Sequence, residues 1–521
     1  MQEMDYLELN GCLAAEHSAE CVAWYSIPLS RITFGETNPF SYKVPYKLSR
    51  TEFDDRLSEI GRALTTFHEL THFLQSWSTT VGILDFLYFT SEYRQLIQIQ
   101  KHADYQLPLE DYFANHIASI QTLTRTTEHD FFRWYIAYKY QVLNRQWLLG
   151  TIPSDIVREK FAERIQMYLP NVFGVASLKF LSQDLDRLYG MDNKAYPLYN
   201  VLSSSLKIYN NPIVIPIGAL HLFECFAKSV EFEHLLWFNT ERASEIIGDW
   251  MSDDAGLTYN APFRLLEQIL EHPDKSALRF IWAHLRIFID IALMYSDFLN
   301  ILPEEVSEKG IINRINAVRV HPGQTFYKVL RAFRKVPVLK DQEEDVLRLY
   351  DDLCHILRFP PLERMLYRLL ALVDSFLEIQ FENSPIRPIF LAAHELVTMK
   401  INDPRLFIND LIHPNRIHDV LNSVWHLMTI EVPGGTLRRE GSRETSEHAM
   451  RGVILEAMNK VSENFLRSTK PFCPLHRDYG GCLLGHKGGN HLAPCAMKNR
   501  FDNNCPIGSF VNRWLEGDST Q

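Results

Sequence analysis

The chain has 521 residues, of which 46% are hydrophobic and 12% aromatic, enough for one large core or for two to three ordinary ones. Its formal net charge of −11 and pI near 6.0 argue against a general polyanion-binding protein, so we expect no nucleic-acid partner. The first residues carry acids where a secretory signal would carry bases before an apolar run. We therefore expect no export signal and a cytoplasmic location.

The first 48 residues contain the clearest strand pattern, at 21–27, followed by turn-rich sequence at 34–39. A small N-terminal β-sheet, packed on the helix that comes next, is the expected result.

That next helix is predicted from Ser49-Arg50-Thr51-Glu52, which has the form of a capping box. Apolar residues then recur at spacings of three and four, at Phe53, Leu57, Ile60, Leu64, Phe67 and Leu74. The spacing predicts one long amphipathic helix, which would point its apolar face toward the core.

The second half of this helix carries His68-Glu69-Leu70-Thr71-His72, an HExxH motif. Two histidines four residues apart lie on one helix face, about 6 Å apart along the axis, so both imidazoles can reach one metal ion. Glu69 projects beside them, where it is poorly placed as a ligand but can accept a proton from an activated water. The alternative is a pair of core histidines with hydrogen-bond partners inside the protein.

Most of the remaining chain shows helical periodicity. Helices are predicted at 83–100, 128–149, 154–168, 178–189, 218–236, 240–251, 262–271, 276–302, 341–357, 361–381, 388–400, 415–429 and 444–467. The most apolar of these, 276–302, contains five ionisable residues at helical spacing, so it predicts a buried bundle helix and no membrane span.

The fold class is therefore predicted to be mainly α, of the α+β type. A break rich in glycine, proline and bases at 303–340 and a linker starting at Pro433 divide the chain. We expect a catalytic core at 1–302, a helical domain at 303–432, and a linker, a helix and a Cys-rich tail at 433–521.

A third metal ligand is expected, since catalytic zinc normally takes three from the protein. Glu224 stands among apolar residues of the helix 218–236, where a carboxylate is costly to bury unless a cation meets it. Its rivals as the ligand are Glu231, His221, and Asp253 or Asp254. The alternative is a Glu224 paired with a buried arginine or histidine.

The motif helix followed by a Glu-bearing helix resembles the zincin metallopeptidases, specifically their gluzincin branch. The metzincin pattern is absent, since its third-histidine position holds Ser78. The resemblance implies a zincin-like core in which His68, His72 and Glu224 hold a catalytic zinc. It also implies that Glu69 is the general base, and that an edge strand beside the motif helix, with 21–27 as the candidate, binds an extended peptide.

The chain departs from the gluzincin pattern in the residue that would orient the first histidine. An acidic residue often stands four positions after the ligand glutamate, but this chain has Lys228 there. The sequence does not identify the residue that orients His68. The donor to the tetrahedral oxyanion is also open among His221, Tyr259 and Tyr295.

Four of the eight cysteines lie in the glycine-rich tail, at Cys473, Cys482, Cys495 and Cys505. Their spacing predicts a second, structural metal site, holding either zinc or an iron–sulfur cluster, with His476, His486 or His491 as alternative ligands. Disulfides and free thiols are the alternatives.

The sequence thus predicts a zinc-dependent metallopeptidase that hydrolyses peptide bonds of a protein or peptide substrate, with a regulatory protein as a further partner. One alternative is a non-catalytic helical interaction protein with structural metal sites, contacting protein or nucleic acid through its tail. Another is a metal-dependent hydrolase of a non-peptide substrate, because the ligands do not specify what the water attacks.

Overall fold

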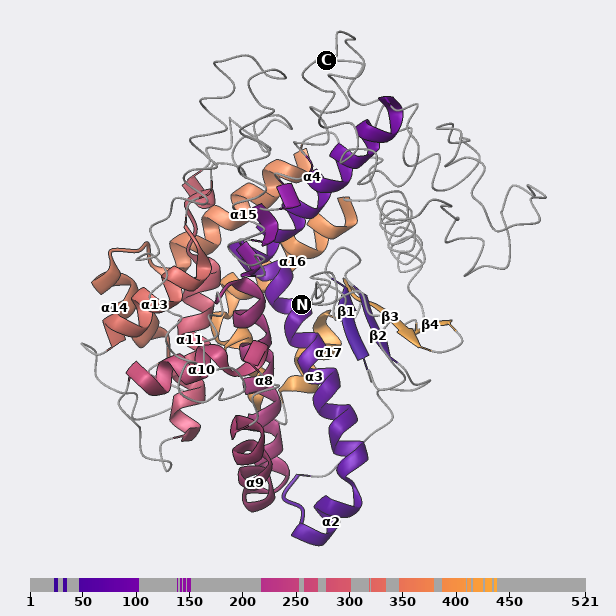
Figure 1. Ribbon diagram of the computed structural model, residues 1–521, viewed down its shortest axis with the longest axis vertical. Helices are drawn as coiled ribbons and strands as arrows, with labels where there is room; N and C mark the ends of the chain where they lie inside the picture. The colour runs from indigo at the N-terminus through magenta and orange to yellow at the C-terminus, as the bar shows by residue number, and fades with distance from the viewer. Residues whose placement is uncertain are drawn as a thin grey trace, which may run out of the picture.

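The computed structural model describes residues 23–26, 31–34, 46–102, 138, 141–142, 144–146, 148–150, 217–252, 257–269, 278–300, 318, 320–333, 346–378, 387–408, 410–413, 416–424, 427–432 and 435–437. This part of the chain is mainly α-helical (Figure 1).

The longer helices are α3 (Leu57–Ser78), α4 (Thr80–His102), α8 (Ala219–Phe238), α9 (Thr240–Ser252), α10 (Leu257–Ile269), α11 (Leu278–Met294), α13 (Pro322–Phe333), α14 (Val346–Leu357), α15 (Leu362–Glu378) and α16 (Arg387–Asn402). The shorter ones are α2 (Arg50–Asp55), α17 (Ile417–Val424) and the 3-10 turns η7 (Asp297–Asn300), η9 (Pro404–Phe407) and η10 (Asp410–Ile412).

The predicted motif helix is in fact two helices, α2 and α3, separated at Arg56. Its predicted capping box is present, since Ser49 Oγ accepts from the Glu52 N–H and the Glu52 carboxylate accepts from the Ser49 N–H. The expectation of one continuous helix was wrong, since the backbone of Arg56 leaves the helical region (φ −107°, ψ 14°). Ion pairs from Arg50 to Glu245 and from Arg242 to Asp54 connect α2 to α9. Leu57, just after the break, is exposed.

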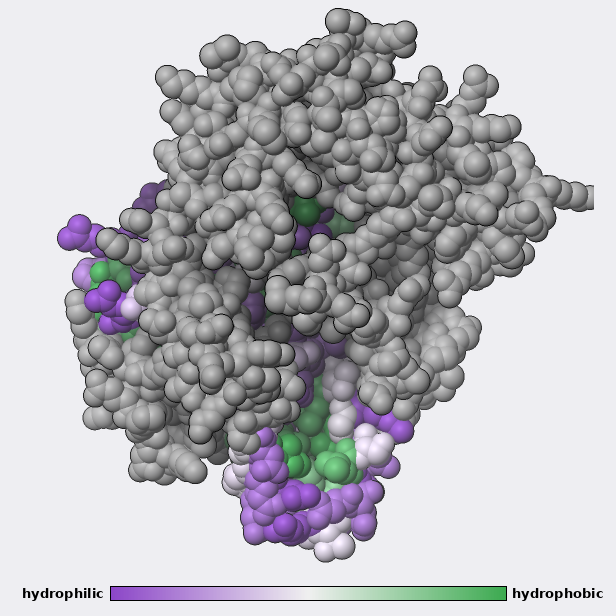
Figure 2. Space-filling model, in the orientation of Figure 1, coloured by the Kyte–Doolittle hydropathy of each residue, from purple (hydrophilic) through white to green (hydrophobic). Residues whose placement is uncertain are grey.

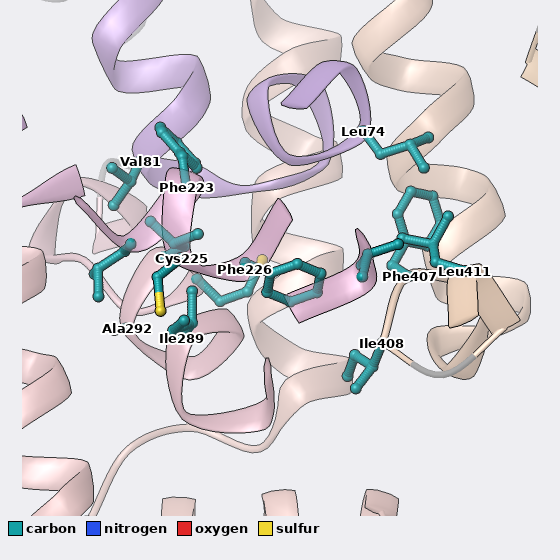
Figure 3. Packing of buried hydrophobic residues seen from close by; sticks show 14 of the residues in the cluster. Leu74, Val81, Phe223, Cys225, Phe226, Ile289, Ala292, Phe407, Ile408 and Leu411 are labelled. Atoms are coloured by element: carbon teal, nitrogen blue, oxygen red, sulfur yellow. The ribbon is translucent and has the colours of Figure 1, made fainter. Parts of the chain in front are cut away.

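The helices α3 and α8 lie side by side and form the most extensive helix–helix contact of the described chain (Figure 1). α8 is buried almost throughout, and the His234 Nε2–H donates to the Leu411 carbonyl oxygen at 2.7 Å. Figure 3 shows Phe223 and Phe226 of α8 among side chains of α3, α11 and the turns η9 and η10. α8 is therefore the central element on which the motif helix is fixed.

One hydrophobic cluster extends from Leu48 to Met428, so residues on both sides of the predicted boundary at 302–303 belong to it. Contacts of α16 with α3 and of α11 with α13, α14 and α15 join the two sides.

Two predicted helices end earlier than expected. The helix predicted at 276–302 ends at Met294. Beyond it, the Ser296 hydroxyl accepts a hydrogen bond from the Phe298 N–H, and the chain continues as the 3-10 turn η7. The helix 415–429 is only α17, since Thr429 already begins a strand. Within the predicted break at 303–340, the chain forms α13.

The described strands form one four-stranded sheet in the order β1 (Ala23–Ser26), β2 (Arg31–Phe34), β3 (Thr429–Val432) and β4 (Gly435–Leu437). The pairs β1–β2 and β3–β4 are antiparallel, whereas β2 and β3 are parallel. The sheet thus combines β1 and β2 from the N-terminal end of the described chain with β3 and β4 from its C-terminal end. β1 lies at the edge of this order and contacts α3.

None of the described helices combines the length and the apolar character that a membrane crossing requires. At the end of the molecule formed by α2 and α9, hydrophilic residues gather on the surface around a few visible apolar ones (Figure 2).

Candidate metal centre

The helices α3 and α8 bring His68, His72 and Glu224 together. The Nε2 atoms of the two histidines are 2.9 Å apart, and Oε2 of Glu224 lies 3.2 Å from Nε2 of His68 and 3.3 Å from Nε2 of His72. One nitrogen from each ring and one carboxylate oxygen therefore converge on a common point, as the sequence predicted.

Local sequence explains how these groups reach one another. Residues 68 and 72 are one turn apart on the inner face of α3, and both side chains are about nine-tenths buried. On α8, Ala219 and Ala227 are fully buried, and such small side chains allow two helices to approach closely. The approach brings the Glu224 carboxylate within reach of both imidazoles.

The spacing of the three atoms fits a zinc ion. Zinc binds imidazole nitrogen and carboxylate oxygen at about 2.0–2.2 Å, and tetrahedral geometry at that length places neighbouring ligand atoms about 3.3 Å apart. The observed separations of 2.9–3.3 Å are close to this value. Two imidazoles and one carboxylate also form a donor set of catalytic zinc sites, which leaves a position for water.

Charge pairing governs the three groups when no metal is bound. Burial alone would lower the pKa of His68, but the carboxylates of Glu231 and Glu224 outweigh it and raise that pKa to about 10. Burial likewise opposes ionisation of Glu224, yet His72 and His68 hold its pKa well below its usual range. A buried carboxylate therefore faces a protonated imidazole at the place where a cation would sit.

Glu69 is buried beside the centre but does not belong to the converging group. Burial raises its pKa, and this effect outweighs the attraction of the carboxylate to His68 and His72. A carboxylate with a raised pKa is a better proton acceptor than an exposed one. Its position is compatible with the predicted role of general base.

The rivals for the third ligand occupy other positions. The His221 ring caps α8, because its Nδ1 accepts the Gly218 N–H at 3.3 Å and the ring also hydrogen bonds to the Leu149 backbone. Burial lowers the pKa of His221 to about 4, so this ring is neutral. Glu231 meets the far nitrogen of His68 and not the metal position. The other rivals, Asp253 and Asp254, lie outside the described residues.

Of the three candidates for the oxyanion donor, Tyr259 is the one whose ring faces His68, at 6.2 Å between centroids. His221 is engaged in capping, and Tyr295 stacks on Phe359 at 3.6 Å. Tyr259 on α10 therefore remains the candidate for this role.

One part of the site was not predicted. Lys228 donates to Oε2 of Glu231 at 2.7 Å, and its ammonium group lies over the rings of Phe232, Trp250 and Tyr259. The available signal was the spacing of Glu224, Lys228 and Glu231, which places all three on one face of α8.

The predicted tail site, with Cys473, Cys482, Cys495 and Cys505 and its histidine alternatives, lies outside the described residues. Two other cysteines are described, and both Cys225 and Cys354 are buried free thiols. Burial raises the pKa of Cys354 to about 12, so this thiol stays protonated.

No family model, curated protein or solved structure matches this chain.

Proposed function

We propose that the protein is a zinc-dependent peptidase whose metal is held by His68, His72 and Glu224. The observation that carries the proposal is the convergence of three ligand atoms within 2.9–3.3 Å of one another, with Glu69 buried beside them. When bound, zinc supplies Lewis acidity that polarises a carbonyl group and makes a water molecule more acidic.

The residues around the ion would divide the remaining work. Glu69 follows His68 directly and is not occupied as a ligand, so its carboxylate is free to accept the proton of the attacking water. The same carboxylate would then deliver that proton to the leaving amine. Tyr259 would donate a hydrogen bond to the developing oxyanion.

A peptide substrate is favoured by the position of β1. In the described sheet this strand is at the edge and contacts α3, the helix that carries the motif. An edge strand offers backbone N–H and C=O groups to an extended chain, which would then lie along α3, the helix that carries His68 and His72. A small non-peptide amide would make no use of such an edge.

The test compares zinc-loaded wild type, Glu69→Gln and Glu59→Gln on a mixture of unstructured peptides analysed by mass spectrometry. Glu59 is a more exposed glutamate on the same helix and serves as the matched control. We expect Glu69→Gln to keep its zinc and to lose at least about 100-fold in kcat/KM, because general-base catalysis contributes about 10²–10⁴-fold. Glu59→Gln should cleave at the wild-type rate.

Full hydrolytic activity in Glu69→Gln would contradict the mechanism. Failure of zinc-loaded wild type to cleave any peptide in the mixture would contradict the substrate class.

A further inference from the structure

The two nitrogens of the His68 ring face different groups. Nε2 points to the metal position, 2.9 Å from Nε2 of His72 and 3.2 Å from Oε2 of Glu224. Nδ1, on the opposite side, forms an ion pair with Oε1 of Glu231 at 2.5 Å, a contact whose angle departs from that of a regular hydrogen bond. The ring is therefore held between two carboxylates of the same helix.

Glu231 is held in turn by Lys228. The second oxygen of its carboxylate, Oε2, accepts from Nζ of Lys228 at 2.7 Å, and both side chains are largely buried. The Lys228 ammonium group also lies 5.7–5.9 Å from the ring centroids of Phe232, Trp250 and Tyr259. Since aromatic faces attract cations, three rings from α8, α9 and α10 fix the position of this charge.

A carboxylate at Nδ1 has a specific effect on a ligand histidine. It accepts the Nδ1–H, so that the lone pair of the neutral ring is on Nε2, and it prevents rotation of the ring. Lys228 gives the carboxylate a second partner, which keeps Glu231 from turning toward the ligand atoms. Lys228, which departs from the gluzincin pattern, is thus in contact with the carboxylate that faces His68.

We propose that Glu231 is a positioning residue for His68, fixing the ring so that Nε2 binds the metal, and that Lys228 positions Glu231. This inference rests on the proposed metal site. In this chain the orienting acid lies seven residues after the ligand glutamate, one turn beyond the lysine that holds it.

The test measures the zinc dissociation constant by chelator competition in wild type, Glu231→Gln, Lys228→Met, Lys228→Arg and Glu245→Gln. Glu245 forms an ion pair of the same i,i+3 spacing with Arg242, on α9 and more exposed, and is the matched control. Urea unfolding of the metal-free proteins is measured in parallel, so that lost orientation is separated from lost stability.

We expect Glu231→Gln to raise the zinc dissociation constant by about 10- to 100-fold, the range found when support of a ligand histidine is removed. Lys228→Met should raise the zinc dissociation constant by a smaller factor. Lys228→Arg should leave it near the wild-type value because the cation is kept, and Glu245→Gln should not change it. Because Glu231 also pairs with Lys228 and His68 in the metal-free protein, Glu231→Gln and Lys228→Met should lower its free energy of unfolding as well, and zinc affinity is compared among the variants that urea unfolding shows to be folded.

Unchanged zinc affinity in Glu231→Gln would overturn the inference while leaving the metal site intact. Absence of zinc binding in wild type would overturn both this inference and the proposed function. If Glu231→Gln fails to fold, the ¹⁵N spectrum of zinc-loaded wild type decides: a proton on Nδ1 of His68 supports the inference, and metal bound through Nδ1 overturns it.

Discussion

Glu92 on α4 is a carboxylate whose surroundings favour the protonated form. Burial raises its pKa to about 7 despite Arg145, whose guanidinium is 3.8 Å away and is mainly engaged with Asp85 at 2.7 Å. One oxygen of Glu92, Oε1, is buried with no hydrogen-bond partner. Folding therefore takes up a proton at this residue at weakly acidic pH.

The sign of the resulting pH dependence follows directly. A carboxyl group that binds its proton more tightly in the folded state stabilises the fold at low pH, and this stability is lost as the pH rises from about 4.5 to about 7. In wild type, the free energy of unfolding should therefore fall by on the order of 3 kcal/mol over this pH range because of Glu92. We expect this decrease to be absent in Glu92→Gln. Urea unfolding at several pH values measures it. An unchanged profile would show that Glu92 ionises normally.

At the scale of single residues, the site could be predicted where its chemistry is local. His68 and His72 are four apart on one helix, and Glu224 stands among apolar neighbours, so their types and spacing were enough to propose the three groups that converge in the structure. The roles of Glu231 and Lys228 depend on how α8 is rotated against α3. That rotation is set by packing and does not appear in the sequence.

The start of α8 is the element whose placement matters most for the site. A Cβ at Gly218 would lie 2.2 Å from the backbone nitrogen of Gly150 and 2.4 Å from the backbone carbon of Leu149. Such distances are impossible without movement of one backbone. Glu224 lies less than two turns further along the helix, so a shift of α8 would displace this ligand.

We expect Gly218→Ala to lower the free energy of unfolding by about 1–3 kcal/mol, as overpacking does, and to weaken zinc binding. Gly248→Ala is the control, because a Cβ at this exposed position of α9 meets nothing within 4 Å. That variant should be more stable than wild type by about 0.5–1 kcal/mol, since alanine favours a helix interior. Urea unfolding measures both. Equal stability of Gly218→Ala and wild type would contradict the close approach.

Most helices of the described residues could be predicted as elements because their apolar periodicity is strong, but some ends could not, and the predicted helices 154–168, 178–189 and 444–467 lie outside the described residues. The break at Arg56 occurs where ion pairs connect α2 to α9, and these pairs join residues 188 and 195 positions apart in sequence. The end of α11 depends on one serine hydroxyl bonding to a nearby backbone N–H. Both signals are weaker than the periodicity that they interrupt.

At the scale of the molecule, a buried ion pair joins helices from both halves of the described chain. Nζ of Lys400 on α16 is 2.6 Å from Oδ1 of Asp290 on α11, and the Tyr350 hydroxyl of α14 donates to the other oxygen at 3.1 Å. The Lys400 side chain is fully buried. Removing one charge would leave the other without its partner in the core.

We expect Lys400→Met to lower the free energy of unfolding by about 3–5 kcal/mol, because it leaves Asp290 unpaired. The double variant with Asp290→Asn should be less destabilised than the sum of the two single variants. Arg50→Met, at an exposed ion pair, is the control and should cost at most about 1 kcal/mol. Strict additivity in the double-mutant cycle would contradict the pairing.

The sheet could not have been predicted in full, although its first strand lies within the segment that the sequence singled out. β2 pairs with β3 across almost 400 residues, and four-residue strands carry little periodicity of their own. The zincin-like arrangement around this sheet stays a prediction, as do the cofactor, the substrate and the tail site.

The most direct test of the metal site is elemental analysis of purified, extensively dialysed wild type and His72→Ala, both checked for folding by circular dichroism. The proposal predicts that wild type holds one zinc ion more per chain than His72→Ala, whatever the cysteine-rich tail binds in both. Equal zinc content in the two folded proteins would contradict it.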